Sequence, residues 1–270
     1  MIILLLLLIL TVYSWNYSHH GHDWGGICAL GHKQTPINID SSVVKEIKYS
    51  DPNHLELHFL FKSVKLHSEV TNTSYIIRGD MGFLTIYKNR KPWLDKIKII
   101  NVHFHSPSEN QLNGEELDLE LHLVMQDPDN RFSFIVFGVL FRVGEKQNVF
   151  IQRIINEFSK DFYFSLEEAF PTSRIMNFYS FEGSLTTPPC SENVIWFIDD
   201  SVQEITREEF DVFNHLWKAN VSFADGFGNN REIQDSSGRV VKHYHDKESF
   251  LKSYIMCGII TLIFIHFVRA

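Results

Sequence analysis

The amino-acid sequence predicts a mainly β (α+β) fold, in which a large, twisted, mostly antiparallel sheet carries a few short surface helices in a single domain. Short runs rich in β-branched and aromatic residues predict the strands: LELHFLF, YIIRG, FLTIY, KIINVHFH, LDLELHLVM, FSFIVFGVLFRVG and NVIWFID. Turn sequences such as RGDMG, SPSEN and QDPDN separate these runs. No internal repeat or low-complexity linker interrupts residues 15–245, which therefore form one predicted domain.

Only two segments have the apolar period of a helix. In QNVFIQRIINEF, Phe150, Ile154 and Phe158 recur at the spacing of one helix face. In TREEFDVFNHLW, Thr206 and Glu209 have the spacing of a capping box, which predicts that a helix begins there.

Composition sets the class of protein. The chain has 270 residues, of which 44% are hydrophobic, enough for one large core. A net charge of −8 without any basic run argues against a nucleic-acid partner, because proteins that bind nucleic acid usually carry a basic surface. We infer no protein partner from the sequence.

Both ends of the chain are apolar. Residues 1–14, MIILLLLLILTVYS, have the length of a signal-peptide core and predict a cleaved signal peptide, with an uncleaved anchor as the alternative. A juxtamembrane stretch at 246–253 precedes a second apolar run at 254–268, which predicts a C-terminal transmembrane anchor. A glycolipid anchor is the rival interpretation, since the small residues Ser236–Gly238 stand at a suitable distance before the run.

These ends predict the secretory pathway, with the domain on the extracellular or lumenal side of the cell surface or an organelle membrane. In that compartment Cys28 and Cys190 can pair, whereas Cys257 lies within the apolar tail. Three N-x-S/T triplets predict glycosylation sites, at Asn16, Asn72 and Asn220.

Three histidines occupy unusual positions in NVHFHSPSENQLNGEELDLELHLVM, residues 101–125. Alternate residues of a strand share a face, so His103 and His105 point the same way, together with Asn101. In the next predicted strand His122 and Glu120 share a face, opposite a row of leucines. If the two strands are neighbours, three imidazoles converge.

Three converging imidazoles suit Zn²⁺ and leave a fourth coordination position open. Such a site is catalytic in type, because zinc lowers the pKa of a bound water to about 7. Glu120 is placed to accept the free N–H of His122, and Asn101 is placed to orient His103. An H-x-H pair alone is more often solvated or structural than a ligand pair; the third histidine and the carboxylate make the zinc interpretation the stronger one.

Several separated motifs make the chain similar to the α-class carbonic anhydrases. They appear in that family's order between Trp15 and Val241, and are QTPINI, HFHSPSE, ELHLV, GSLTTPPC, VIW and NNR. The resemblance covers nearly the whole predicted domain. It implies a zinc lyase, of the secreted or membrane-anchored type, that reversibly hydrates carbon dioxide to bicarbonate and a proton, and it implies that His103, His105 and His122 are the zinc ligands.

The resemblance also implies roles that the local pattern does not. Thr186 matches a threonine whose hydroxyl accepts a hydrogen bond from the attacking hydroxide and donates one to Glu109, and Thr187 lies beside it on the bicarbonate side. Cys28 and Cys190 match a disulfide of the secreted members. An apolar wall for carbon dioxide is implied at Val124, Val136, Leu185, Val194 and Trp196; without the resemblance, each would be taken for a core residue.

The chain departs from the family at two positions that bear on activity. Tyr75 stands where fast members have a histidine that relays the proton, and a phenol with a pKa of about 10 is a poor relay at neutral pH. Slow, proton-transfer-limited turnover is the expectation. Asn110 stands where the family usually has histidine, and we expect it to loosen Glu109. The alternative function is a catalytically weak surface recognition or adhesion domain, which the complete histidine set disfavours.

Overall fold

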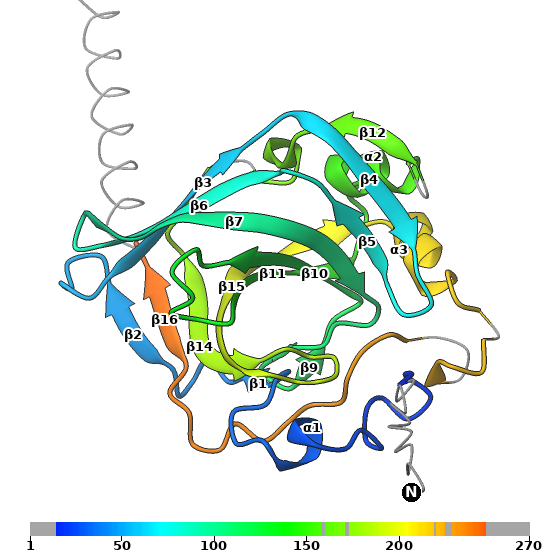
Figure 1. Ribbon diagram of the computed structural model, residues 1–270, viewed down its shortest axis with the longest axis horizontal. Helices are drawn as coiled ribbons and strands as arrows, with labels where there is room; N and C mark the ends of the chain where they lie inside the picture. Colours follow the sequence, from blue (N-terminus) through cyan, green and yellow to red (C-terminus); the bar gives the residue numbers. More distant parts are fainter. Residues whose placement is uncertain (1–14, 158–159, 171–172, 219, 225–227, 247–270) are drawn as a thin grey trace, which may run out of the picture.

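The structure is a computed structural model that describes residues 15–157, 160–170, 173–218, 220–224 and 228–246. Strands dominate it, and the few helices are short (Figure 1). The elements, in chain order, are α1 Ile27–Leu30, β1 Asn38–Ile39, β2 Lys45–Lys48, β3 Leu55–Phe61, β4 Val64–Val70, β5 Tyr75–Arg78, β6 Gly82–Lys88, β7 Lys91–His105, β8 Gln111–Leu112, β9 Glu115–Glu116, β10 Leu119–Gln126, β11 Phe134–Val143, α2 Val149–Ile155, β12 Asp161–Phe164, the 3₁₀ turn η1 Leu166–Glu168, β13 Arg174–Ile175, β14 Phe178–Ser184, β15 Glu192–Ile205, α3 Arg207–Asn214 and β16 Lys242–His245.

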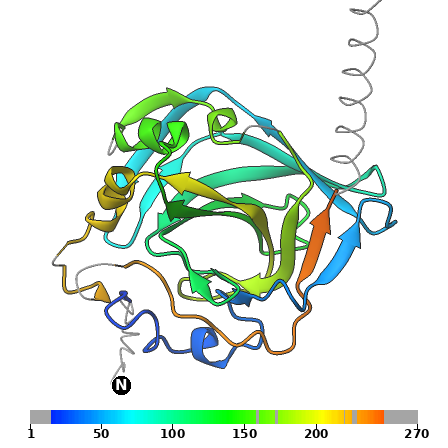
Figure 2. The ribbon, with the colours of Figure 1, turned by 180° about the vertical axis from the view of Figure 1, so that it is seen from behind.

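A 13-stranded mixed sheet organises the domain. Its main path runs β12-β4-β5-β7-β10-β11-β15-β14-β16-β2, and β6, β3 and β13 continue from the long strand β7. Only the β11–β15 and β16–β2 pairs of this sheet are parallel among the described strands. The predicted mainly β, mostly antiparallel, single-domain fold is confirmed, and the sheet curls strongly on itself in both views (Figures 1 and 2).

Both predicted helices are present, and they touch each other. α2 is shorter than its predicted segment and begins after Asn148, whose side chain accepts the N–H of Ile151. α3 begins with the predicted capping box, in which Thr206 and Glu209 satisfy each other's backbone N–H groups. The buried carboxylate of Glu209 also accepts the N–H of Asn148, at 3.1 Å. One carboxylate therefore ties the first turns of both helices together.

The central strands are buried on both faces, and an apolar cluster lies against each face. The larger cluster lies on the face of β7 and β10 that carries Val102, Phe104, Leu121 and Leu123. A smaller one gathers around Trp196 on the face that carries His122. Polar side chains within that second face therefore lie in a largely desolvated setting.

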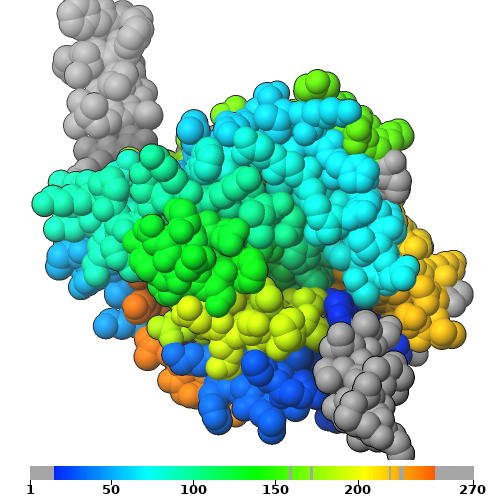
Figure 3. Space-filling view, viewed as in Figure 1, coloured from blue at the N-terminus to red at the C-terminus, as the bar shows by residue number. Residues whose placement is uncertain are grey.

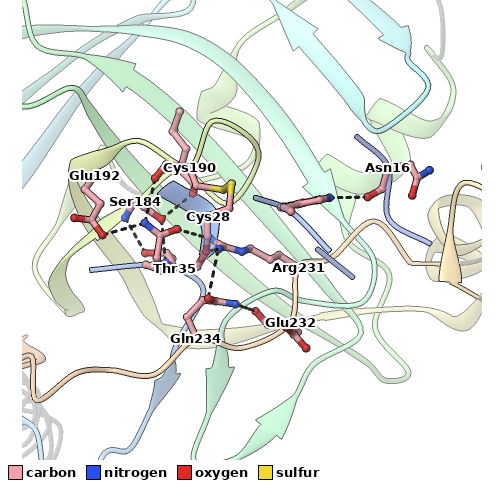
Figure 4. The surroundings of a disulfide bond; sticks show 12 residues. Asn16, Cys28, Thr35, Ser184, Cys190, Glu192, Arg231, Glu232 and Gln234 are labelled. Atoms are coloured by element: carbon pink, nitrogen blue, oxygen red, sulfur yellow. Dashed lines mark hydrogen bonds between the residues drawn. A yellow bond between two sulfur atoms is a disulfide. The ribbon is translucent and has the colours of Figure 1, made fainter. Parts of the chain in front are cut away.

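A disulfide joins Cys28, in α1, to Cys190, in the loop before β15 (Figure 4). The Arg231 guanidinium lies beside it and donates to the carbonyl oxygens of Cys28 and Thr35, both at 2.7 Å. The Gln34 side chain donates to the Cys190 carbonyl oxygen at 3.2 Å. These bonds therefore hold together the N-terminal segment, the segment that carries Arg231 and the loop before β15.

Removing this disulfide by replacing both cysteines with serine is expected to lower the free energy of unfolding by about 4 to 5 kcal/mol. The bond closes a loop with a sequence separation of 162 residues, so it removes much conformational freedom from the unfolded chain. Urea unfolding of the double variant and the wild type, both under oxidising conditions, measures the difference. Equal midpoints with equal slopes would contradict the expectation.

The predicted signal peptide at 1–14 and the predicted anchor at 254–268 lie outside the described residues, as does the predicted juxtamembrane stretch from residue 247 on. No helix within the described part of the chain is long and apolar enough to cross a membrane. The small residues Ser236–Gly238 form a turn inside the domain, closed by Arg239 N–H donating to the Ser236 carbonyl oxygen at 3.0 Å. Strand β16, which pairs with β14 and β2, follows this turn.

Candidate metal centre and active site

Strand pairing brings the three predicted histidines together. His103 and His105 lie at the end of β7, and β10 places His122 directly opposite His103. The ring centroids are 4.6 to 5.2 Å apart. One nitrogen from each ring lies within 4.8 Å of the others. Among the described residues, these three side chains could therefore hold a metal ion together. The predicted convergence is confirmed.

Hydrogen bonds fix which nitrogen of each ring is available. His103 Nδ1 donates to Asn101 Oδ1 at 2.9 Å, and His105 Nδ1 donates to the Asn229 carbonyl oxygen at 2.7 Å. His122 Nε2 lies 2.9 Å from Glu120 Oε1, the acceptor for its proton. Each ring therefore keeps a lone pair on its other nitrogen, Nε2 in two rings and Nδ1 in His122.

Glu120, which contacts His122, is itself fixed by three hydrogen bonds. Its Oε2 accepts the backbone N–H groups of Glu109 and Asn110, both at 2.8 Å, and its Oε1 accepts the Asn110 side-chain amide at 2.8 Å. Asn110 Oδ1 in turn accepts the N–H of Ile37. Asn110 is fully buried and braces the Glu120 carboxylate. That it loosens Glu109 stays a prediction.

Burial keeps two of the rings neutral. It is the largest effect lowering the pKa of His103 and of His105 well below the usual range, and repulsion from His122 adds to it. Burial also acts against the charged form of His122, but Glu120 and Glu109 outweigh it and raise that pKa. His105 Nε2 is buried without a hydrogen-bond partner among the described residues. Neutral rings and an unpartnered inward nitrogen fit Zn²⁺, which would be held by these three histidines.

Glu109 lies beside the histidine group with one oxygen already engaged. Its Oε1 accepts the backbone N–H of Arg231 at 2.9 Å, and its Oε2 lies 3.4 Å from His105 Nε2. Complete burial raises the pKa of Glu109 to about 7, against the opposing effects of His122, a hydrogen bond from Thr186 and the Arg231 N–H. A bound cation nearby would favour the carboxylate form.

The loop that carries Thr186 is fixed on both sides. Before it, Ser184 and Thr35 exchange backbone-to-hydroxyl hydrogen bonds of 3.0 Å in both directions, and Trp196 Nε1 donates to the Ser184 carbonyl oxygen at 3.0 Å. After it, the Cys190 N–H donates to the Thr187 carbonyl oxygen at 2.8 Å. Thr186, which is 5% exposed, therefore reaches Glu109 from a preorganised loop.

The predicted apolar wall lies beside the histidines. Trp196 contacts the His122 ring edge to face, with 4.9 Å between centroids. The five predicted wall residues all belong to one packed cluster, Val124, Val136, Leu185, Val194 and Trp196. A site with polar ligands on one side and this wall on the other suits a small uncharged substrate.

Tyr75 is the predicted catalytic residue that the structure does not bring to this site. It lies opposite Phe104, whereas the next residue, Ile76, lies opposite His103. Because directly opposite residues share a face, the Tyr75 ring points into the core on the other side of the sheet. There it is fully buried, stacks on Phe104 and contacts Phe213, and burial raises its pKa.

Two residues that lie close to the ligands were missed by sequence reasoning. Asn229 positions His105 through its carbonyl oxygen, and its side chain donates to the Phe104 carbonyl oxygen at 2.8 Å. Gly138 lies opposite His122 in β11, where a Cβ would come within 3.1 Å of Glu120 Oε1 and 2.6 Å of Ile198. A glycine within a strand is the signal for such a close approach, and the NNR motif is the signal for Asn229.

The comparisons with known proteins agree with this geometry. The model of the eukaryotic-type carbonic anhydrase family matches residues 16–245. The chain is 31% identical to alpha carbonic anhydrase 3 of Arabidopsis thaliana, over 80% of this chain and 75% of the relative. It is 27% identical to a carbonic anhydrase of Pectobacterium carotovorum, over 85% of this chain and 90% of the relative.

A solved structure shares the fold. The α-carbonic anhydrase of Thermovibrio ammonificans, in complex with the inhibitor sulfanilamide, is 26% identical with a TM-score of 0.62, covering 80% of this chain and 89% of its own. A family match over most of the chain, together with three imidazoles arranged for zinc, makes the assignment plain. The chain belongs to the eukaryotic-type carbonic anhydrase family and is a zinc lyase that hydrates carbon dioxide.

Proposed function

We propose that this carbonic anhydrase interconverts carbon dioxide and bicarbonate with the histidine group as its centre and with proton transfer as its slow step. The observation that carries the site assignment is the convergence of His103, His105 and His122, each oriented by its own hydrogen-bond partner. Bound zinc supplies a Lewis acid that makes a water acidic near neutral pH. The rest of the catalysis comes from the residues around it.

Glu109 and Thr186 orient the nucleophile. The Arg231 N–H occupies one oxygen of Glu109, and the carboxylate accepts the Thr186 hydroxyl proton. That hydroxyl therefore presents a lone pair, not its proton, to the attacking oxygen, and this fixes the direction of attack. The wall around Trp196 excludes water from the place where carbon dioxide lies. The products are bicarbonate and one proton for each carbon dioxide and water consumed.

Slow proton transfer is expected because β5 places no proton-carrying side chain toward the histidines. The residue opposite His103 is Ile76, which has no group to carry a proton, and the Tyr75 ring lies in the core. We expect turnover at saturating carbon dioxide to rise with the concentration of an imidazole buffer and to level off, with kcat/KM unchanged, because buffer replaces the relay. Stopped-flow hydration at constant pH and ionic strength measures this.

A kcat that does not depend on buffer concentration would contradict the proposal. Tyr75→His serves as a further check, because its side chain would enter the core. We expect this variant to be less stable and not faster, whereas acceleration in dilute buffer would show that position 75 reaches the active site. The alternative function, a surface recognition domain with weak activity, is supported only if zinc-loaded protein shows no hydration above the control without enzyme.

We further propose that the chain enters the secretory pathway, that its domain faces the cell exterior or an organelle lumen, and that residues 254–268 anchor it. Supporting this are the paired cysteines, which favour an oxidising compartment, and the place of Ser236–Gly238 before β16, where anchor attachment would remove a strand. Release from membranes by a phosphatidylinositol-specific phospholipase would contradict the transmembrane anchor. A glycosidase-sensitive mass shift would test use of Asn16, Asn72 and Asn220.

A further inference from the structure

The side of the sheet that carries the zinc ligands also carries charged residues. β5 places Ile76 opposite His103 and Arg78 opposite Asn101. β4 places Glu69 opposite Ile76. Directly opposite residues of antiparallel strands point to one face, so Arg78 and Glu69 lie on the face of the histidines.

Arg78 and Glu69 form an ion pair at the edge of this face. The Arg78 guanidinium donates to the Glu69 carboxylate, and the two side chains are 50% and 40% exposed. Arg78 is the cross-strand neighbour of Asn101, which places its Cα roughly 8 Å from that of His103.

The two sides of the site therefore differ in polarity. The wall around Trp196 is apolar, whereas the side formed by β4 and β5 presents a guanidinium. In the space-filling view the cyan surface of β4 and β5 lies to one side, and the yellow-green segment that carries Thr186 lies below it (Figure 3). Carbon dioxide is uncharged and gains little from a guanidinium, whereas bicarbonate is a planar oxyanion that a guanidinium binds well.

We propose that Arg78 is an anion-binding residue at the edge of the active site, which attracts bicarbonate, and that Glu69 limits this affinity by competing for the guanidinium. The proposal rests on the carbonic anhydrase activity and adds the residue pair that sets affinity for its anionic product. Small monovalent anions that reach the metal are bound by the same charge, since the attraction is electrostatic.

The test measures binding of thiocyanate, a monovalent anion that does not react, to the full zinc-loaded chain by isothermal titration calorimetry at low ionic strength. Arg78→Gln is expected to weaken binding about three- to tenfold, and Glu69→Gln to tighten it about two- to fivefold. The two effects have opposite signs, which a general structural disturbance would not produce. Both are expected to shrink in concentrated salt.

Arg142→Gln is the matched control. Arg142 forms a similarly exposed ion pair with Glu115, with side chains 51% and 56% exposed, near the C-terminal end of β11 and four residues beyond Gly138, which lies opposite His122. We expect it to leave thiocyanate affinity unchanged. Equal affinity of Arg78→Gln and the wild type, weakening by both Arg78→Gln and Glu69→Gln, or no measurable binding to the wild type would each overturn the proposal.

Zinc content and hydration, measured on the same wild-type samples, distinguish a failure of the proposed activity from a failure of the proposed anion site. A wild type without hydration contradicts the activity, whereas a hydrating wild type whose thiocyanate affinity ignores Arg78 contradicts only the anion site. The KM for bicarbonate in the dehydration direction provides a second readout and is expected to rise in Arg78→Gln.

Discussion

Replacing His122 with alanine is expected to abolish stoichiometric zinc binding and to reduce carbon dioxide hydration to the uncatalysed rate. The variant keeps two imidazoles and leaves Glu120 buried without the imidazole N–H that it now accepts. Loss of an outer partner alone typically costs about 10- to 100-fold in metal affinity, and loss of a ligand costs more. Metal analysis after dialysis, with stopped-flow hydration on the same sample, measures both effects.

Two further variants, one with a milder expected effect and one with none, serve as controls for this result. Glu120→Gln keeps all three ligands and is expected to weaken zinc binding about 10- to 100-fold without abolishing it. His19→Ala removes an exposed histidine and is expected to change neither zinc content nor rate. If His122→Ala kept both full zinc occupancy and wild-type hydration, the histidine group would not be the metal centre.

Replacing Thr186 with alanine is expected to lower kcat/KM for hydration about 10²- to 10³-fold at unchanged zinc content. The hydroxyl is held by Glu109, which is itself held by the Arg231 N–H, so its orientation is fixed before substrate arrives. Losing it removes the directed hydrogen bond but none of the ligands. The ratio of kcat/KM values between variant and wild type gives the lost transition-state stabilisation.

Two further variants test the direction of that hydrogen bond. Thr186→Ser keeps the hydroxyl and is expected to lose far less activity than the alanine variant. Glu109→Gln keeps the shape of the side chain but can donate to Thr186, which would turn the hydroxyl proton toward the nucleophile. A large loss in Glu109→Gln with little loss in Thr186→Ser supports the proposed orientation, and the reverse order would contradict it.

The zinc ligands were predictable because strand alternation is a local property. Once KIINVHFH and LDLELHLVM are taken as strands, period two alone puts His103 with His105 and His122 with Glu120. The capping box at Thr206 is equally local and was confirmed. Strand pairing, which brings the two strands together, was only assumed from the sequence and is supplied by the β7–β10 register.

The direction of the Tyr75 side chain could not be predicted, because the sequence does not fix the phase of a short strand. β5 has four residues, and its register against β7 decides which of Tyr75 and Ile76 faces the histidines. A one-residue shift would exchange the two faces. In the observed register the ring is buried beside Phe104 and Phe213, where it adds to the apolar core.

The supporting contacts could not be predicted because they join distant parts of the chain. Asn229 reaches His105 across 124 residues, and Arg231 reaches Cys28 across 203. Neither local periodicity nor composition carries such pairings. Asn110 shows a different limit: its residue type did not indicate that its amide donates to Glu120.

The measurement that tests the central claim most directly is zinc content together with carbon dioxide hydration of the purified wild-type chain, before chelation, after chelation and after zinc is restored. The account predicts about one zinc per chain, hydration that disappears with the metal, and hydration that returns with it. A chain that binds no zinc, or that hydrates carbon dioxide equally well with and without it, would contradict the account.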